Sequence, residues 1–104
     1  MEAALDKQAI DILMLDIRQI SYFADYFVIC SADSDRQIHA IRDEIDEVLS
    51  REGIKLYHQE GSEGSGWVLL DFGQVVVHVF ATPQREYYGI EKLWSKATPV
   101  VRIL

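Results

Sequence analysis

The densest pattern of apolar positions runs from Gly66 to Phe80, with the sequence GWVLLDFGQVVVHVF. Two strand-like segments flank a turn at residues 72–74, where Gly73 supplies the positive φ that tight hairpin turns require. If the turn has two residues, period-2 alternation divides the hairpin into an aliphatic face and a mixed face. The aliphatic face holds Val68, Leu70, Val75, Val77 and Val79, and the mixed face holds Trp67, Leu69, Asp71, Val76, His78 and Phe80. A three-residue loop would undo this division. The aliphatic face needs a core, so we place candidate function on the mixed face.

Upstream of the hairpin, the pattern predicts two strands and one long helix. Residues 12–17 are a short apolar run, and residues 26–30 are aromatic and β-branched without alternation, which is typical of a central strand covered on both faces. Ser34 and Gln37 form a capping box that begins a helix, and Gly53 ends it. The helix carries one apolar stripe at spacings of three and four: Ile38, Ile41, Ile45, Val48 and Leu49.

The remaining segments are less regular. We expect a helix at about residues 2–10, a connection at 18–24, a third strand at 54–57 and a flexible loop at 60–66. Pro83 favours a helix start, and the aromatic-rich helical segment that follows is broken near Gly89. Residues 97–104 form either an edge strand or a mobile tail. Together these elements predict a single α/β domain over residues 1–104, with a mixed sheet of about five strands packed by helices.

Composition narrows the class of protein. The chain has 104 residues, a net charge of −7 and one cysteine. The acidic balance argues against a direct nucleic-acid binder and suits a basic protein partner, although acidity also serves solubility alone. The sequence contains no apolar run long enough to span a bilayer and no signal-peptide pattern at its N-terminus. We therefore expect a soluble cytoplasmic protein that does not associate with membranes.

Metal and thiol chemistry are poorly supported by the sequence. The histidines, at positions 39, 58 and 78, lack the paired spacing of metal ligands, so we expect no metal and no cofactor. Cys30 ends an apolar strand, where a free cysteine usually acts as a small hydrophobe rather than a nucleophile.

Nucleotide binding is the more serious enzymatic alternative. Residues 31–34 link a strand to a helix N-terminus, a place where backbone donors can hold a phosphate. A nucleotidyltransferase-like enzyme would use Asp71 with Ser31, Asp33 or Ser34 around a magnesium–nucleotide complex. However, Asp71 lacks a second acid at the alternate positions of its strand, and the glycine-rich phosphate motifs are absent from the sequence.

A protein-binding surface is the third candidate. Trp67, Leu69 and Phe80 share the mixed face with His78 and Asp71, and two tyrosines and a tryptophan follow at positions 87, 88 and 94. Tryptophan and tyrosine are enriched at the centres of protein interfaces. The competing interpretation is that a helix covers this face and that all these side chains belong to the core.

The hairpin sequence, together with five shorter segments, resembles the ribosomal silencing factor family, also called Iojap (RsfS). The shorter segments are residues 25–29 (DYFVI), 34–37 (SDRQ), 60–61 (EG), 85–88 (REYY) and 90–94 (IEKLW), in the family's order. They span nearly the whole chain. Two positions depart from the family pattern: Ala32 replaces a usual glycine, and Gln74 replaces a usual aspartate in the turn. Neither lies on the mixed face.

The resemblance implies a nucleotidyltransferase-like fold without catalytic acids, and a translation repressor rather than an enzyme. Such proteins bind the large ribosomal subunit through a ribosomal protein of the L-fourteen family and block joining of the small subunit when nutrients are short. By matching position, the residues implied to contact that protein are Trp67, Asp71, His78, Tyr88 and Leu93. The resemblance also implies a homodimer, which could use a sheet edge or the same apolar surface.

Overall fold

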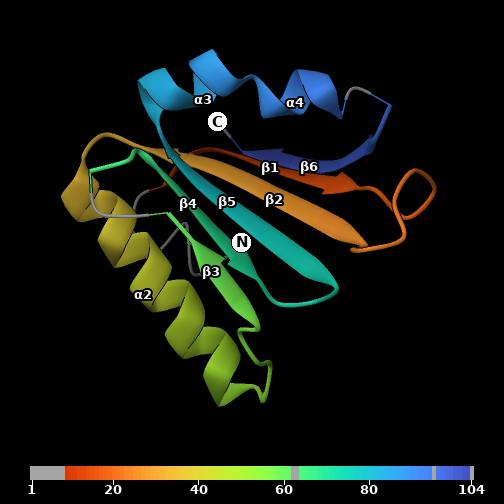
Figure 1. Cartoon of the computed structure of the whole chain (residues 1–104), viewed down its shortest axis with the longest axis horizontal. Coiled ribbons are helices and arrows are strands. Elements are labelled where there is room, and N and C mark those ends of the chain that lie inside the picture. Colours follow the sequence, from red (N-terminus) through yellow and green to blue (C-terminus); the bar gives the residue numbers. More distant parts are fainter. Residues whose placement is uncertain (1–8, 62–63, 95, 104) are drawn as a thin grey trace.

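The computed structural model describes residues 9–61, 64–94 and 96–103 of the chain. Its centre is a six-stranded sheet with the order β3-β4-β5-β2-β1-β6 (Figure 1). β2 and β5 are parallel, and the other neighbouring pairs are antiparallel. The strands are β1 (Ile10–Asp16), β2 (Tyr26–Ala32), β3 (His58–Glu60), β4 (Trp67–Asp71), β5 (Val75–Ala81) and β6 (Thr98–Ile103). The predicted α/β class with a mixed sheet is confirmed, with one more strand than expected.

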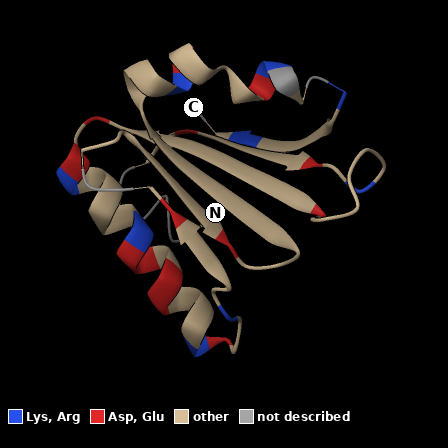
Figure 2. Cartoon of the chain, in the orientation of Figure 1, with Lys and Arg blue, Asp and Glu red and all other residues tan. Residues whose placement is uncertain are grey.

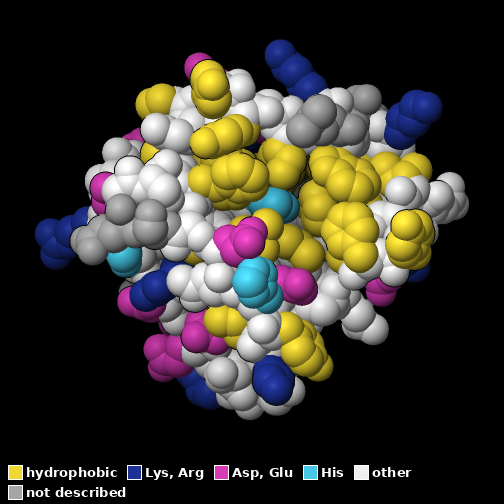
Figure 3. Space-filling model, viewed as in Figure 1, with side chains coloured by type: hydrophobic (Ala, Val, Ile, Leu, Met, Phe, Trp, Pro, Cys, Tyr) yellow, Lys and Arg dark blue, Asp and Glu magenta, His cyan; other side chains and the backbone are white. Residues whose placement is uncertain are grey.

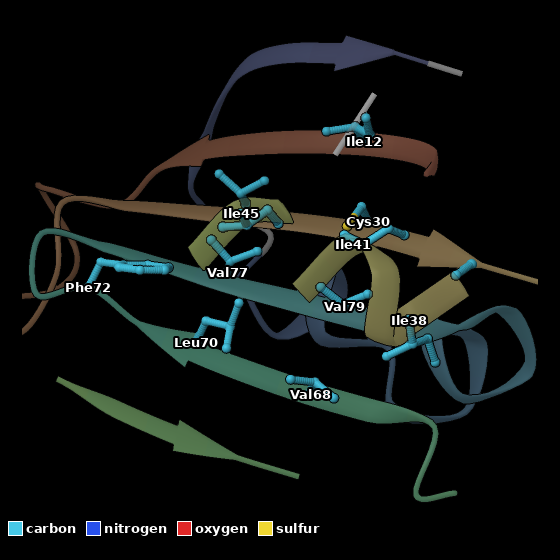
Figure 4. Packing of buried hydrophobic residues seen from close by; sticks show 12 residues of the cluster. Ile12, Cys30, Ile38, Ile41, Ile45, Val68, Leu70, Phe72, Val77 and Val79 are labelled. Atoms are coloured by element: carbon cyan, nitrogen blue, oxygen red, sulfur yellow. The ribbon is translucent and has the colours of Figure 1, made fainter. Parts of the chain in front are cut away.

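The helix α2 (Asp35–Arg51) covers one face of the sheet. Ser34 caps it as predicted, because its Oγ accepts the N–H of Gln37 at 3.2 Å. The Gln37 side chain reaches back one residue further than a standard capping box and accepts the N–H of Asp33. The stripe of isoleucines packs on alternate residues of the strands (Figure 4), in a core that includes Val28, Cys30, Ile38, Ile41, Ile45, Val68, Leu70, Val77 and Val79.

A second core lies on the opposite face of the sheet. The two short helices α3 (Thr82–Tyr88) and α4 (Ile90–Leu93) run along it and are separated by Gly89, which has φ +55°. This core includes Leu13, Leu15, Phe27, Ile29, Val76, Phe80 and Ile90, with Trp67, Leu69 and Trp94 packed at its border. β2 therefore contributes to both cores, which confirms its prediction as a central strand covered on both faces.

The hairpin has the register of a two-residue turn at Gly73 and Gln74. Asp71 pairs with Val76 and Trp67 pairs with Phe80, and the N–H of Phe72 donates to the carbonyl of Val75. Gly73 has φ +90°, a conformation that glycine adopts without strain. Because this register keeps the period-2 alternation, the predicted division into an aliphatic face and a mixed face is confirmed.

One expectation about secondary structure is wrong, and another falls mostly on residues that the structure does not describe. Residues 54–57 form no strand: β3 begins at His58, which already pairs with Asp71 at the end of β4, so the preceding residues run past their partner strand. Most of the helix expected at residues 2–10 falls outside the described residues, and Ile10 begins β1. The C-terminal segment is an edge strand, β6, paired with β1.

Charged side chains concentrate on α2, whereas the sheet is largely uncharged (Figure 2). Among the described residues, no helix is long and apolar enough to cross a bilayer.

Candidate functional site

The candidate site is the border of the mixed face on β3 and β4, which we call the β3–β4 surface: Glu60, Trp67, Leu69, Asp71 and Tyr88. The pairing of Glu60 with Leu69 continues the mixed face across β3. Tyr88 reaches it from the end of α3. Figure 3 shows hydrophobic side chains gathered below α3 and α4, with acidic and histidine side chains beside them. An aromatic surface with an acidic border is thus built from three elements.

Trp67 is half-buried and held on three sides. Its ring stacks on Phe80 at 5.1 Å between centroids and lies 4.7 Å from the ring of Tyr88. Its indole Nε1–H donates to Nδ1 of His78 at 3.2 Å. A tryptophan fixed in this way presents contact area with little conformational entropy left to lose on binding.

His78 lies beneath this surface rather than on it, because only 2 % of the residue is exposed. Burial lowers the pKa of its imidazole to about 4, so the ring is neutral at pH 7. Nδ1 accepts the bond from Trp67, which places the proton on Nε2, and that atom has no hydrogen-bond partner among the described residues. In this structure His78 therefore supports Trp67 from below.

Asp71 ends β4 at the hairpin turn. One carboxylate oxygen accepts the N–H of Gly73 at 2.8 Å, a turn-stabilising contact that leaves the side chain half-buried at the surface border. On the neighbouring strand β3, His58 Nε2 lies 3.3 Å from Glu60 Oε1. The carboxylates of Glu60 and Asp71 make this border acidic.

Tyr88 is 45 % exposed, and its ring also packs near that of Phe80, with 6.2 Å between the ring centroids. Leu93 is the last residue of α4, and its side chain lies outside the described part of the chain. The structure therefore brings Trp67, His78 and Tyr88 into contact and places Asp71 on the same face at the far end of β4, four residues from Trp67. The fifth predicted residue, Leu93, has no described side chain.

A groove of about 580 Å³ opens beside Trp67. Its lining includes all of the β3–β4 surface except Asp71, together with Gly61 and Ser65. Ser65 Oγ donates to the carbonyl of Trp67 at 3.0 Å. At Gly61, which has φ +105°, an added Cβ would lie 2.1 Å from that same carbonyl oxygen. Gly61 thus permits the close approach of two backbones that shapes the groove.

Glu60 was not among the predicted site residues. Its role depends on the register between β3 and β4, and the sequence signal pointed to a strand at residues 54–57 instead. The Glu60-Gly61 pair belonged to the family resemblance, which was the only available signal for it.

The residues of the nucleotidyltransferase alternative are not assembled. Asp71 pairs with Val76, which in turn pairs with Phe27 on β2. Ser31 lies four residues further along β2, roughly 13 Å away at the rise of a β-strand, and on a strand that is not adjacent to β4. Asp33 and Ser34 follow the end of β2, and Ser34 is the N-cap of α2. The structure therefore does not place Asp71 beside them.

Comparisons with known proteins agree with this picture. A family model described as "Ribosomal silencing factor during starvation" matches residues 1–103. The ribosomal silencing factor RsfS of Bacillus subtilis is 50 % identical over 92 residues, which are 88 % of this chain and 78 % of that protein. RsfS of Halalkalibacterium halodurans is 44 % identical over 95 residues, 91 % of this chain and 81 % of that protein. A crystal structure of a Chromobacterium violaceum protein superposes with a TM-score of 0.87 at 36 % identity, covering 90 % of this chain and 78 % of the other. With its sequence and fold both matched over most of their length, the chain belongs to the ribosomal silencing factor family.

Proposed function

We propose that the chain is a ribosome-associated repressor of translation. It binds the large ribosomal subunit through a ribosomal protein of the L-fourteen family and sterically blocks joining of the small subunit when nutrients are limiting. Membership in the ribosomal silencing factor family supports the ribosome-associated role. A cytoplasmic location belongs to the same proposal.

The observation that carries the binding site is the half-buried Trp67 at the centre of the β3–β4 surface. Rigid aromatic side chains beside a groove are the usual anchors of protein interfaces, and buried tryptophan and tyrosine account for much of their binding energy. In this proposal Trp67, Asp71, Tyr88 and Leu93 touch the partner, and His78 holds Trp67 in place. None of these contacts requires covalent chemistry, so the proposed role is occlusion rather than catalysis.

The acidic border suits a basic partner. Glu60 and Asp71 flank the aromatic centre, and the chain as a whole carries a net charge of −7. Ribosomal proteins are commonly basic, and complementary charge speeds encounter and fixes orientation. Direct grip on ribosomal RNA would be opposed by the same charge, which is why we assign the contact to protein.

The first prediction concerns Trp67→Ala. We expect this variant to lose at least about tenfold in affinity for isolated large subunits, since truncation of a central aromatic anchor costs roughly 2 kcal/mol or more. Binding is measured by co-sedimentation with large subunits over a protein concentration series. Light scattering of mixed large and small subunits then tests whether wild type, and not the variant, prevents their joining.

Tyr22→Ala is the matched control. Tyr22 is fully exposed in the connection between β1 and β2 and is not among the residues that we place in the partner contact, so its loss tests the removal of an exposed aromatic ring alone. We expect wild-type affinity from it. Wild type that neither binds large subunits nor blocks joining would overturn the proposal.

The same surface is our candidate for homodimer formation. Trp67, Leu69 and Tyr88 expose apolar area next to a groove, and a second copy could cover them. In that arrangement self-association and ribosome binding would compete for one surface.

A further inference from the structure

One buried charge on α3 lies outside the β3–β4 surface. Arg85 is 5 % exposed, a rare condition for arginine, which is almost never buried without partners. Its Nε donates to the Glu91 carboxylate of α4 at 2.7 Å, and its Nη1 donates to Ser31 Oγ of β2 at 2.9 Å. One side chain thus joins both short helices to the sheet.

The same guanidinium also reaches β1. Nη1 donates to the backbone carbonyl of Asp11, and Nη2 lies 3.6 Å from the Asp11 carboxylate. Asp11 has the left-handed φ of +47°, at the irregularity in the β1–β2 pairing. Its carboxylate accepts two hydrogen bonds from Arg102 of β6, at 2.8 and 2.9 Å. Five elements therefore meet around Arg85.

Arg85 stands one helical turn before Tyr88 on α3. Tyr88 in turn lies against Trp67, so the placement of α3 decides whether the tyrosine reaches the tryptophan. α3 has only seven residues, lacks a side-chain cap and is followed at once by the left-handed Gly89. A helix this short has little stability of its own, and its position depends on tertiary contacts.

We propose that Arg85 is a positioning residue of the β3–β4 surface. It holds α3 and α4 on the sheet and so sets Tyr88 beside Trp67. The consequence for ribosome binding rests on the proposed function, whereas the consequence for the Trp67 environment does not. The planar fork of arginine is needed, because lysine carries the same charge but cannot bond Glu91 on one side and Ser31 and Asp11 on the other.

The test is Arg85→Lys in the full chain, read by two measurements. In a Trp94→Phe background, where Trp67 is the remaining tryptophan, we expect its fluorescence emission to shift to the red as Tyr88 moves away. Affinity for large subunits, without the background change, should fall by about tenfold. Arg51→Lys makes the same chemical change at an exposed i,i+4 ion pair on α2 and should alter neither.

Loss of stability is controlled separately. Ile45→Val thins the core beneath α2, on the other face of the sheet, and should lower the melting temperature while leaving emission and affinity unchanged. If it weakens binding as much as Arg85→Lys at an equal loss of stability, Arg85 is merely structural and the proposal is overturned. Should Arg85→Lys fail to fold, Glu91→Gln weakens the tie between the helices, because it removes the carboxylate charge but keeps an acceptor for Nε. It should give a red shift in the same direction.

The outcomes separate the two proposals. Wild type that binds no large subunits overturns the proposed function, while the emission shift still supports the positioning role of Arg85. If the emission of Trp67 is unchanged in both Arg85→Lys and Glu91→Gln, the positioning role is overturned. It is also overturned if wild type binds large subunits and Arg85→Lys shows the red shift but binds them with wild-type affinity.

Discussion

At the scale of single residues, the pair of Trp67 and His78 shows how a polar group is used inside an apolar core. A buried imidazole is costly unless it stays neutral and finds a hydrogen-bond partner. The indole N–H of Trp67 supplies that partner, and Phe27 packs against the imidazole at 4.8 Å between centroids. Because the bond orients Trp67, a buried residue contributes to the exposed surface.

The low pKa of His78 makes stability depend on pH. In the unfolded chain the imidazole titrates near its ordinary value of 6.5, and in the folded protein near 4. Between these values the unfolded state binds a proton that the folded state does not, so stability falls as pH decreases from 6.5 and levels off below 4. The full effect is roughly 3 kcal/mol. We expect urea unfolding at a series of pH values to show this loss in wild type.

His78→Gln should remove this pH-dependent loss of stability. His58→Gln, at an exposed position, should retain it. The quantity compared is the difference in unfolding free energy between variant and wild type at each pH, since carboxylates such as Asp11 also titrate at low pH. Hydrogen bonding from Arg102 lowers the pKa of Asp11, and its contribution is common to all three proteins. Equal pH slopes in wild type and His78→Gln would contradict the neutral, buried assignment.

At the scale of elements, the groove beside Trp67 depends on how the chain enters β4. Between β3 and β4, the chain passes close to the backbone of Trp67 at Gly61. Ser65 Oγ then donates a hydrogen bond to the carbonyl of Trp67. The short β3 strand is held by only three paired residues. A change at this entry therefore acts on the groove directly.

Gly61→Ala should be strongly destabilising. Its φ of +105° disfavours any L side chain, and the new Cβ would meet the Trp67 carbonyl oxygen at 2.1 Å, so the backbone of β4 must shift. We expect a loss of about 2 kcal/mol or more in urea unfolding, with weaker large-subunit binding. Gly64→Ala is the control: it has φ +82° but open space around it, so only a strain of about 1 kcal/mol is expected and binding should persist. Similar losses for the two variants would refute the close-approach explanation.

At the scale of the whole molecule, the sheet separates two surfaces with different chemistry. α2 covers one face and carries much of the charge (Figure 2), whereas the other face is only partly covered by two short helices. The uncovered border is where apolar side chains reach solvent (Figure 3). The open edge at β6 is a weaker site for pairing with a second copy, because Pro99 lacks an N–H and Arg102 is charged.

This asymmetry predicts how copies associate. In sedimentation equilibrium over a concentration series, we expect the average mass of wild type to rise toward that of a dimer. Trp67→Ala should remain closer to monomeric, because the variant loses apolar area on the β3–β4 surface, whereas Tyr22→Ala should behave as wild type. A wild type that stays monomeric at every concentration would refute homodimer formation. Dimerisation that survives Trp67→Ala unchanged would move the interface to another surface.

Local pattern was sufficient for several features of this protein. The division of the hairpin into two faces, the cap at Ser34, the isoleucine stripe of α2 and the break at Gly89 were all predicted. Each depends on residues within a few positions of one another, where side-chain periodicity and backbone preference act. The order of motifs along the chain also identified the family.

Only the tertiary structure decided which of these side chains are exposed. His78 and Trp67 share one face of one hairpin, yet one is buried and the other half-exposed, because α3 and α4 cover that face unevenly. The start of β3 at His58 follows from where β4 ends. Arg85 donates a hydrogen bond to Asp11, which lies 74 positions away in the chain. Such pairings lie between segments distant in sequence, and local periodicity carries no information about which segments meet.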